Sequence, residues 1–352
     1  MEDASLSAAA DKVEMGPMII DQDGDLILAV GPSDCQSSFK VDASTLRRTS
    51  PVWKAMLYRP WIESQPKDDS EWIVELPEDD PAALTVLLGI IHSNFDLVPA
   101  TDKITASLVW GILVLCDKYD MIQSIIPYIT IWRTHIKQQA PKSEVILSLL
   151  IAWEIGDENW LRDLLKDLVH HTCVYGSTKQ ITYESVDNLG FHTIYLTGSA
   201  LEKFGPPQLL DHIVDIRSRV LNYYLRFINT EIEIRLSGKP RRPDAAQRPC
   251  RHEVKGCDEL VLGGLIRGLS MVGLPAFNLR KKATEVNMNI AKFEEACHGV
   301  FHQLKIYPDT LLGRTVQLHD TCAIGPSFEF SPTMKNEART KIREEINKNL
   351  LT

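Results

Sequence analysis

The chain has 352 residues, of which 44% are hydrophobic and 24% are charged, and its formal net charge is -9. This length and composition predict a globular protein of two or three domains, with cores large enough to fold without disulfide or metal cross-links. The acidic balance argues against a nucleic-acid-binding protein, and no apolar run approaches the roughly 20 residues of a membrane span, so no membrane partner is expected.

Residues 1–14 are acidic and rich in alanine, and they lack the basic and apolar regions of a signal peptide. We expect this segment to be a disordered leader and the protein to be intracellular, in the cytoplasm, the nucleus or both. In a reducing compartment, the seven cysteines are expected to be thiols or metal ligands and not a disulfide framework.

Two strands are predicted near the start of the chain, at "DLILAV" (25–30) and at "FKV" (39–41), joined as a hairpin by a turn-rich loop. Residues 42–57 have a helical pattern that Pro51 interrupts. The run "EWIVEL" (71–76) has strand character again. The order of these elements is typical of an α+β fold.

Helices dominate the sequence that follows. Asp80 and Pro81 are suited to the N-cap and first position of a strong helix. A further helix carries Leu108 to Tyr119, and Asp120 is a candidate N-cap for the next one. Residues 143–237 are predicted to be helical throughout and to end in a long amphipathic helix.

The segment 238–249, "GKPRRPDAAQRP", is predicted to be a linker, because it contains three prolines and no apolar residue other than alanine. Its basic residues leave a nuclear-import signal open as an alternative. Glycine, cysteine and histidine become more frequent after it. We therefore expect a separate C-terminal domain, mainly helical, over residues 250–352.

Four pieces of the first 130 residues resemble a BTB/POZ domain: "DLILAV" with "FKV", "LRRTSPVWKAML", "IVELPEDDPAALTVLLGIIHSNF" and "LVWGILVLCDKYDMIQSIIPYI". The resemblance implies a small sheet with helices over residues 15–138, followed by a helical, BACK-like domain over 139–237. The family usually has a histidine where this chain has Asp42, and the whole layout is most similar to divergent BTB-domain proteins of filamentous fungi. BTB domains are interaction modules, so the resemblance implies docking and self-association without catalysis.

The stretch "MLYRPWIE" (56–63) resembles the cullin-binding pattern of BTB adaptors, with Met56-Leu57 in place of the usual Met-aromatic pair. In that pattern the pair is followed, after three residues, by a hydrophobic residue, any residue and Glu. The resemblance implies that a cullin contacts the following residues: Met56, Leu57, Trp61, Ile62 and Glu63. An exposed aromatic beside a carboxylate is also a plausible binding hot spot. The alternative is that Trp61 folds back onto its own domain and that Glu63 is simply solvated.

Two functions follow from the resemblance. In the first, the BTB domain binds itself or a cullin-type ubiquitin ligase while the later domains choose an unknown client protein. In the second, the protein is a scaffold or transcription-associated oligomeriser that uses a BTB homodimer without any ligase. Leu46, Val52 and Trp53 offer apolar surface for the dimer, although a monomer stays open because residues 1–14 are too polar to provide an exchanged strand.

A structural zinc ion is the one cofactor that the residues suggest. Cys250 and Cys257 near the start of the C-terminal segment, with His319 and Cys322 near its end, supply the four ligands of a closed tetrahedral site. The spacing is not that of a standard zinc finger, and unpaired thiols scattered through a small domain are the alternative.

The other reactive residue types have structural explanations, so we do not expect an enzyme. Cys297 lies on an apolar helical stripe, and Cys116 likewise, which predicts core positions for both. His298 and His302 are four residues apart but have no third ligand in view. Acidic residues such as Asp157 stand at helix starts, where negative charge caps the helix, and no glycine-rich phosphate loop is present.

Overall fold

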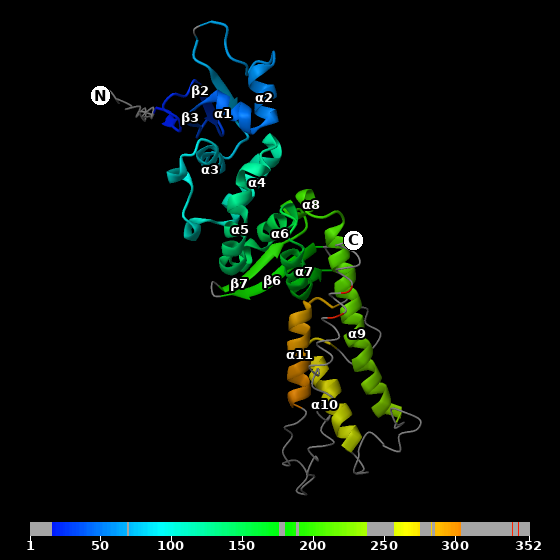
Figure 1. The fold of residues 1–352 in the computed structure, drawn as a ribbon. Helices are drawn as coiled ribbons and strands as arrows, with labels where there is room; N and C mark the ends of the chain where they lie inside the picture. The colour runs from blue at the N-terminus through cyan, green and yellow to red at the C-terminus, as the bar shows by residue number, and fades with distance from the viewer. Residues whose placement is uncertain are drawn as a thin grey trace, which may run out of the picture. The chain divides into compact units, whose positions relative to one another are not determined.

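The structure is a computed structural model, and it describes residues 16–68, 70–175, 180–187, 190–237, 257–274, 283, 286–303, 340 and 344. The chain divides into two compact units (Figure 1), which we call unit 1 (residues 1–140) and unit 2 (residues 141–352). Both units combine helices with a small sheet, so the α+β class predicted from the sequence is confirmed.

A four-stranded sheet forms one side of unit 1. Its strand order is β1-β3-β2-β4, with bounds Met18–Ile19, Ser37–Val41, Leu26–Val30 and Ile73–Leu76 respectively. The antiparallel pairing of β2 with β3 confirms the predicted hairpin, and β4 pairs parallel with β2. β1, which the sequence analysis did not predict, pairs parallel with β3.

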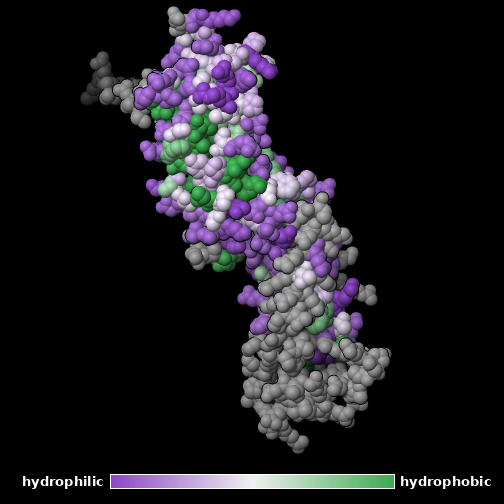
Figure 2. Space-filling view, viewed as in Figure 1, coloured by the Kyte–Doolittle hydropathy of each residue, from purple (hydrophilic) through white to green (hydrophobic). Residues whose placement is uncertain are grey.

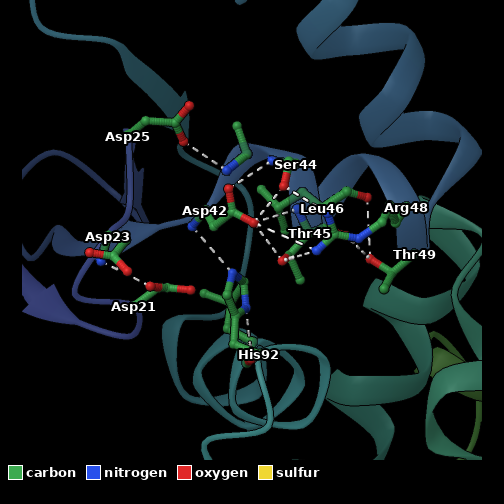
Figure 3. Close-up of polar contacts among 12 residues, drawn as sticks. Asp21, Asp23, Asp25, Asp42, Ser44, Thr45, Leu46, Arg48, Thr49 and His92 are labelled. Atoms are coloured by element: carbon green, nitrogen blue, oxygen red, sulfur yellow. Dashed lines mark hydrogen bonds and ion pairs between the residues drawn. The ribbon is translucent and has the colours of Figure 1, made fainter.

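A pair of short helices follows the hairpin, α1 (Ala43–Thr49) and α2 (Pro51–Tyr58). Asp42 caps α1: its carboxylate accepts hydrogen bonds from the backbone N–H groups of Ser44 and Thr45 and from both their hydroxyls (Figure 3). Burial alone would raise the pKa of Asp42, but these hydrogen bonds outweigh it and lower the pKa to about 2. Ser50 caps α2 and Pro51 occupies its first position, so the proline separates two helices.

The remaining helices of unit 1 are α3 (Pro81–Ile91), the 3-10 turns η1 (Phe95–Leu97) and η2 (Thr101–Lys103), α4 (Ala106–Tyr119) and α5 (Ile122–Gln139). Asp80 caps α3 as predicted. The prediction for Asp120 is wrong. Asp120 ends α4 in a left-handed conformation, which aspartate tolerates better than most residues, and its N–H bonds to the carbonyls at 116 and 117.

The core of unit 1 lies between the sheet and these helices. Leu46 and Trp53 are fully buried in it, and the Trp53 ring stacks on that of Tyr119 with the ring centroids 4.4 Å apart. Cys116 is buried there as predicted. Burial raises the pKa of its thiol to about 12, so the sulfur is an unreactive core group.

Unit 2 begins with the turn η3 (Lys142–Glu144) and the helical hairpin of α6 (Val145–Glu154) and α7 (Glu158–His171). The prediction that 143–237 is helical throughout is wrong, because a three-stranded antiparallel sheet follows α7. Its strands are β5 (Thr172–Tyr175), β6 (Gln180–Asp187) and β7 (Gly190–Tyr195). β-Branched and aromatic residues are frequent in these strands, and such residues fit a pleated surface.

Three helices complete the described part of unit 2 after the short α8 (Ala200–Phe204): α9 (Leu209–Ser237), α10 (Cys257–Met271) and α11 (Ile290–Gln303). The 29-residue α9 is the predicted long helix. α10 packs against α9 and α11, and α11 also packs against α7. The described residues beyond 250 therefore belong to the same compact unit as the middle segment.

Cys297 is fully buried in α11, as its helical stripe predicted. Across the described ranges, no helix has both the length and the apolar character that crossing a membrane requires.

Candidate docking surface

The segment that joins α2 to β4 presents two adjacent hydrophobic side chains to solvent. Trp61 is 62% exposed and Ile62 is 95% exposed. In Figure 1 this segment projects beyond the sheet and helices of unit 1. Binding is favoured when a partner covers exposed apolar side chains and removes their surface from water. The pair Trp61 and Ile62 is therefore the candidate docking surface.

The main chain around the pair forms a compact turn at residues 59–64. The Trp61 N–H donates to the Arg59 carbonyl, 2.7 Å away, and the Ser64 N–H donates to the Trp61 carbonyl, 3.3 Å away. The Ser64 hydroxyl also accepts from the Trp61 N–H at 3.1 Å and donates to the Arg59 carbonyl. The turn is therefore closed by both backbone and side-chain hydrogen bonds.

A second connection joins the turn to the sheet through Trp72. Its indole N–H donates to the Glu63 carbonyl at 2.9 Å, while its own carbonyl accepts from the N–H of Ile27 in β2, also at 2.9 Å. The Trp72 ring is buried and meets the ring of Tyr58 edge-on, at 6.2 Å between centroids.

Tyr58 extends this packing to α1. The guanidinium of Arg47 lies over the Tyr58 ring, 4.9 Å from its centroid. Burial raises the pKa of the Tyr58 hydroxyl, although Arg47 opposes that shift. Ile73, at the start of the edge strand β4, is a further exposed hydrophobic residue.

The five residues that the family pattern selected fall into three groups. Trp61 and Ile62 are exposed, and Met56 and Glu63 are half-buried. Leu57 is 1% exposed. Leu57 therefore belongs to the core of unit 1, because the inward face of α2 carries it, and its side chain is not part of the docking surface.

The surface expected for a dimer needs a similar correction. Leu46 and Trp53 are core residues, as described above, and only Val52 of that set is exposed. Other exposed apolar side chains of unit 1 are Met18 and Ile19 of β1, Phe95 of η1 and Val114 of α4. Figure 2 shows hydrophobic residues gathering in the region of α3 and α4 on the viewed face of unit 1.

The candidate metal ligands lie largely beyond what the structure describes. Cys250, His319 and Cys322 are outside the described residues, and only the backbone of Cys257 is described, at the first position of α10. Within the described ranges, no group of three or more His, Cys, Asp or Glu residues is arranged to hold a metal ion. His298 is exposed on α11.

Unit 2 contains one charged network that the sequence did not suggest. The carboxylate of Asp167 accepts from the ammonium of Lys142 at 2.8 Å and from the Tyr183 hydroxyl at 2.7 Å, and His171 Nδ1 lies 3.3 Å from it. Burial would raise the pKa of Asp167, but the hydrogen bonds from His171, Lys142 and Tyr183 hold it well below its usual range. The network joins η3, α7 and β6.

Sequence reasoning also missed Ser64 and Trp72. Both are ordinary residue types in a polar, proline-containing stretch, and their contacts involve tertiary geometry. A weak signal was present, since serine and proline favour turns and the indole N–H of a buried tryptophan needs an acceptor. Comparison of the chain with protein-family models and with curated proteins gave no match.

Proposed function

We propose that this protein is a protein–protein interaction adaptor whose N-terminal unit is a BTB/POZ-type domain that docks a cullin scaffold, while unit 2 contacts a client protein. The observation that carries the proposal is the exposure of Trp61 and Ile62, side by side, in the turn that follows α2. The alternative in which Trp61 packs back onto its own domain is disfavoured by that exposure.

The order of elements in unit 1 supports the BTB-type assignment. A strand hairpin, a helix pair, a parallel strand, a single helix and a further helix pair follow one another, as expected from the resemblance.

The energetics of the pair suit a binding hot spot. A large aromatic side chain that becomes fully desolvated at an interface typically contributes about 2 kcal/mol or more to binding, as measured by truncation to alanine. Ile62 adds apolar area beside it. The half-buried Glu63 follows at the place where the cullin-binding pattern has its carboxylate.

A second candidate function, an oligomeriser without a ligase, is favoured by β1. This strand lies at the edge of the sheet, and both its residues, Met18 and Ile19, are exposed. An edge strand with exposed apolar side chains offers main-chain and side-chain contacts to a second copy. Light scattering of the full chain distinguishes a dimer, at twice 39.7 kDa, from a monomer.

Copurification tests the adaptor function. The tagged full-length protein is expressed in cells, and the recovered complex is probed for a cullin. We expect a cullin to be recovered with the wild type and with Phe95→Ala, which removes a comparably exposed aromatic (58%) elsewhere in unit 1, and to be lost with Trp61→Ala. A dimeric wild-type protein that recovers no cullin favours the oligomeriser.

A further inference from the structure

The exposure of Trp61 and Ile62 is unusual because both side chains are large and apolar. Burial of such a side chain is favourable by about 2 kcal/mol. A free loop carrying them would gain by folding back onto unit 1. The main chain on either side of the pair is held in place, however, and the two connections that hold it come from different parts of the fold.

The first connection is local and depends on one hydroxyl. Ser64 Oγ accepts a hydrogen bond from the Trp61 N–H at 3.1 Å and is in direct contact with the Arg59 carbonyl. Arg59 is the residue that ends α2. The hydroxyl thus fixes the turn to the end of the helix.

The second connection is tertiary and depends on one indole. Trp72 is anchored to the sheet by its backbone bond to Ile27 and by burial of its ring, and its side chain holds the Glu63 carbonyl. The main chain that carries Ile62 is therefore held on both sides. The Ser64 hydroxyl binds the N–H of Trp61 before it, and the Trp72 indole binds the carbonyl of Glu63 after it.

From these contacts we infer that Ser64 and Trp72 are positioning residues that hold the turn at 59–64 in its docking conformation before a partner binds. The inference rests on the proposed function, because it concerns the same surface. Neither side chain needs to touch the partner. Each acts by restricting the conformations of the residues that do.

Pre-organisation of this kind raises affinity because less conformational entropy is lost on binding. Removing one of the connecting hydrogen bonds should weaken partner binding by about fivefold, which corresponds to one net hydrogen bond. The effect should be smaller than that of removing Trp61 itself. The fold should stay intact, since Ser64 lies in an exposed turn outside the core.

Hydrogen–deuterium exchange of the free, full-length protein measures the turn without any partner. The variants are Ser64→Ala, which deletes the hydroxyl, Ser64→Thr, which keeps it, and Ser70→Ala as the matched control. Ser70 lies in the same segment, and its hydroxyl donates to Asp68 at 2.5 Å. Trp72→Phe removes the indole donor and keeps an aromatic ring.

We expect amide exchange in peptides covering 59–64 to be about fivefold faster in Ser64→Ala and Trp72→Phe than in wild type. Ser64→Thr and Ser70→Ala should exchange at the wild-type rate, with the melting temperature of all the serine variants unchanged. Equal exchange rates in Ser64→Ala and wild type would overturn the inference, whatever binds.

Calorimetric titration with the N-terminal helices of a cullin, using the same variants, separates this inference from the proposed function. Wild type that binds, with affinity reduced by about fivefold in Ser64→Ala and restored in Ser64→Thr, supports both. Wild-type affinity in Ser64→Ala despite faster exchange overturns the positioning role. Wild type that fails to bind overturns the cullin assignment, while faster exchange in Ser64→Ala would still establish that the hydroxyl orders the turn.

Discussion

The hydroxyl of Tyr119 donates a hydrogen bond to the carboxylate of Asp79 inside unit 1, although the two residues are 40 positions apart. Lys118 forms an ion pair with the same carboxylate, and the carbonyl of Tyr119 accepts from the Ser50 hydroxyl at 2.5 Å. Asp79 is almost completely buried, so each of these partners offsets part of the cost of burying its charge. The contacts join the start of α3, the end of α4 and the junction of α1 with α2.

Tyr119→Phe should therefore lower the free energy of unfolding by about 1–3 kcal/mol, because it leaves a buried carboxylate without one of its donors. Urea unfolding followed by tryptophan fluorescence measures the change. Tyr58→Phe is the control, since the Tyr58 ring is partly exposed and loss of its hydroxyl should change stability by less than about 0.5 kcal/mol. Equal stability of the two variants would contradict this role of Tyr119.

Arg217 makes a comparable connection in unit 2. It is buried in α9, and its guanidinium donates to the carbonyls of Thr172 at 3.0 Å and of Val286 and Met288 at 2.7 Å each. Arg217→Met should lower the free energy of unfolding by about 3 kcal/mol, because buried carbonyls lose their donor. It should also speed hydrogen exchange in residues 286–303.

The matched control for Arg217 lies half a turn away on the same helix. Arg219 is half-exposed and pairs with Asp215 at 2.6 Å, so Arg219→Ala should change stability by about 1 kcal/mol or less. If exchange in 286–303 is the same in both variants, Arg217 does not hold α11 in place.

The Asp167–His171 pair should make unit 2 sensitive to pH. The hydrogen bond that His171 donates to the Asp167 carboxylate raises the pKa of His171 above 6.5, against the effect of burial, so its stabilisation is complete below pH 6.5 and is lost as pH rises through the folded-state value. The lowered pKa of Asp167 has the opposite consequence: its stabilisation is present above pH 3.8 and is lost as pH falls. The pair therefore stabilises the fold most between these two pH values.

His171→Gln tests this pH dependence. The melting temperature of wild type should exceed that of His171→Gln at pH 5.5 and approach it as pH rises above 6.5, because the wild-type imidazole then loses its charge. A difference that stays constant from pH 5.5 to pH 8.5 would show that the charge of His171 is not involved.

A zinc content of about one ion per chain is predicted if Cys250, Cys257, His319 and Cys322 form a closed site, since joining them would close a loop of about 65 residues. Cys250→Ser and Cys322→Ser should then release the metal and make residues 250–352 sensitive to protease. Cys35→Ser is the control, because Cys35 is an exposed thiol in unit 1. Much less than one zinc per wild-type chain, with that segment still protease-resistant, would mean that the four residues hold no metal.

Local sequence patterns predicted those helices and strands whose formation depends mainly on neighbouring residues. The turn residues identified the hairpin around residues 31–36. Capping residues identified the helix start at Asp80–Pro81, and helical periodicity identified the long helix α9. The sheet of β5, β6 and β7 was missed because its strands follow a strongly amphipathic helix and were assigned its character. Their β-branched and aromatic residues favour strands, so a local signal for the sheet was present in the sequence and was overlooked.

Among the candidate docking residues, the sequence pattern selected Trp61 and Ile62, whose side chains are exposed, but it could not show that Leu57 faces the core. Contacts between residues distant in sequence, such as Trp72 with Glu63 or Tyr119 with Asp79, depend on how the helices and sheet pack. No local pattern carries that information, so these positioning and core residues became visible only in the fold.

The most direct test of the docking account is calorimetric titration of the full-length protein with the N-terminal helices of a cullin, alongside Trp61→Ala and the exposed-aromatic control Phe95→Ala. The account predicts that Trp61→Ala raises the Kd by about 30-fold, equivalent to about 2 kcal/mol, while Phe95→Ala binds like wild type and both variants keep the wild-type melting temperature. Binding of Trp61→Ala within twofold of wild type, or a sharply lowered melting temperature with unchanged affinity, would contradict it.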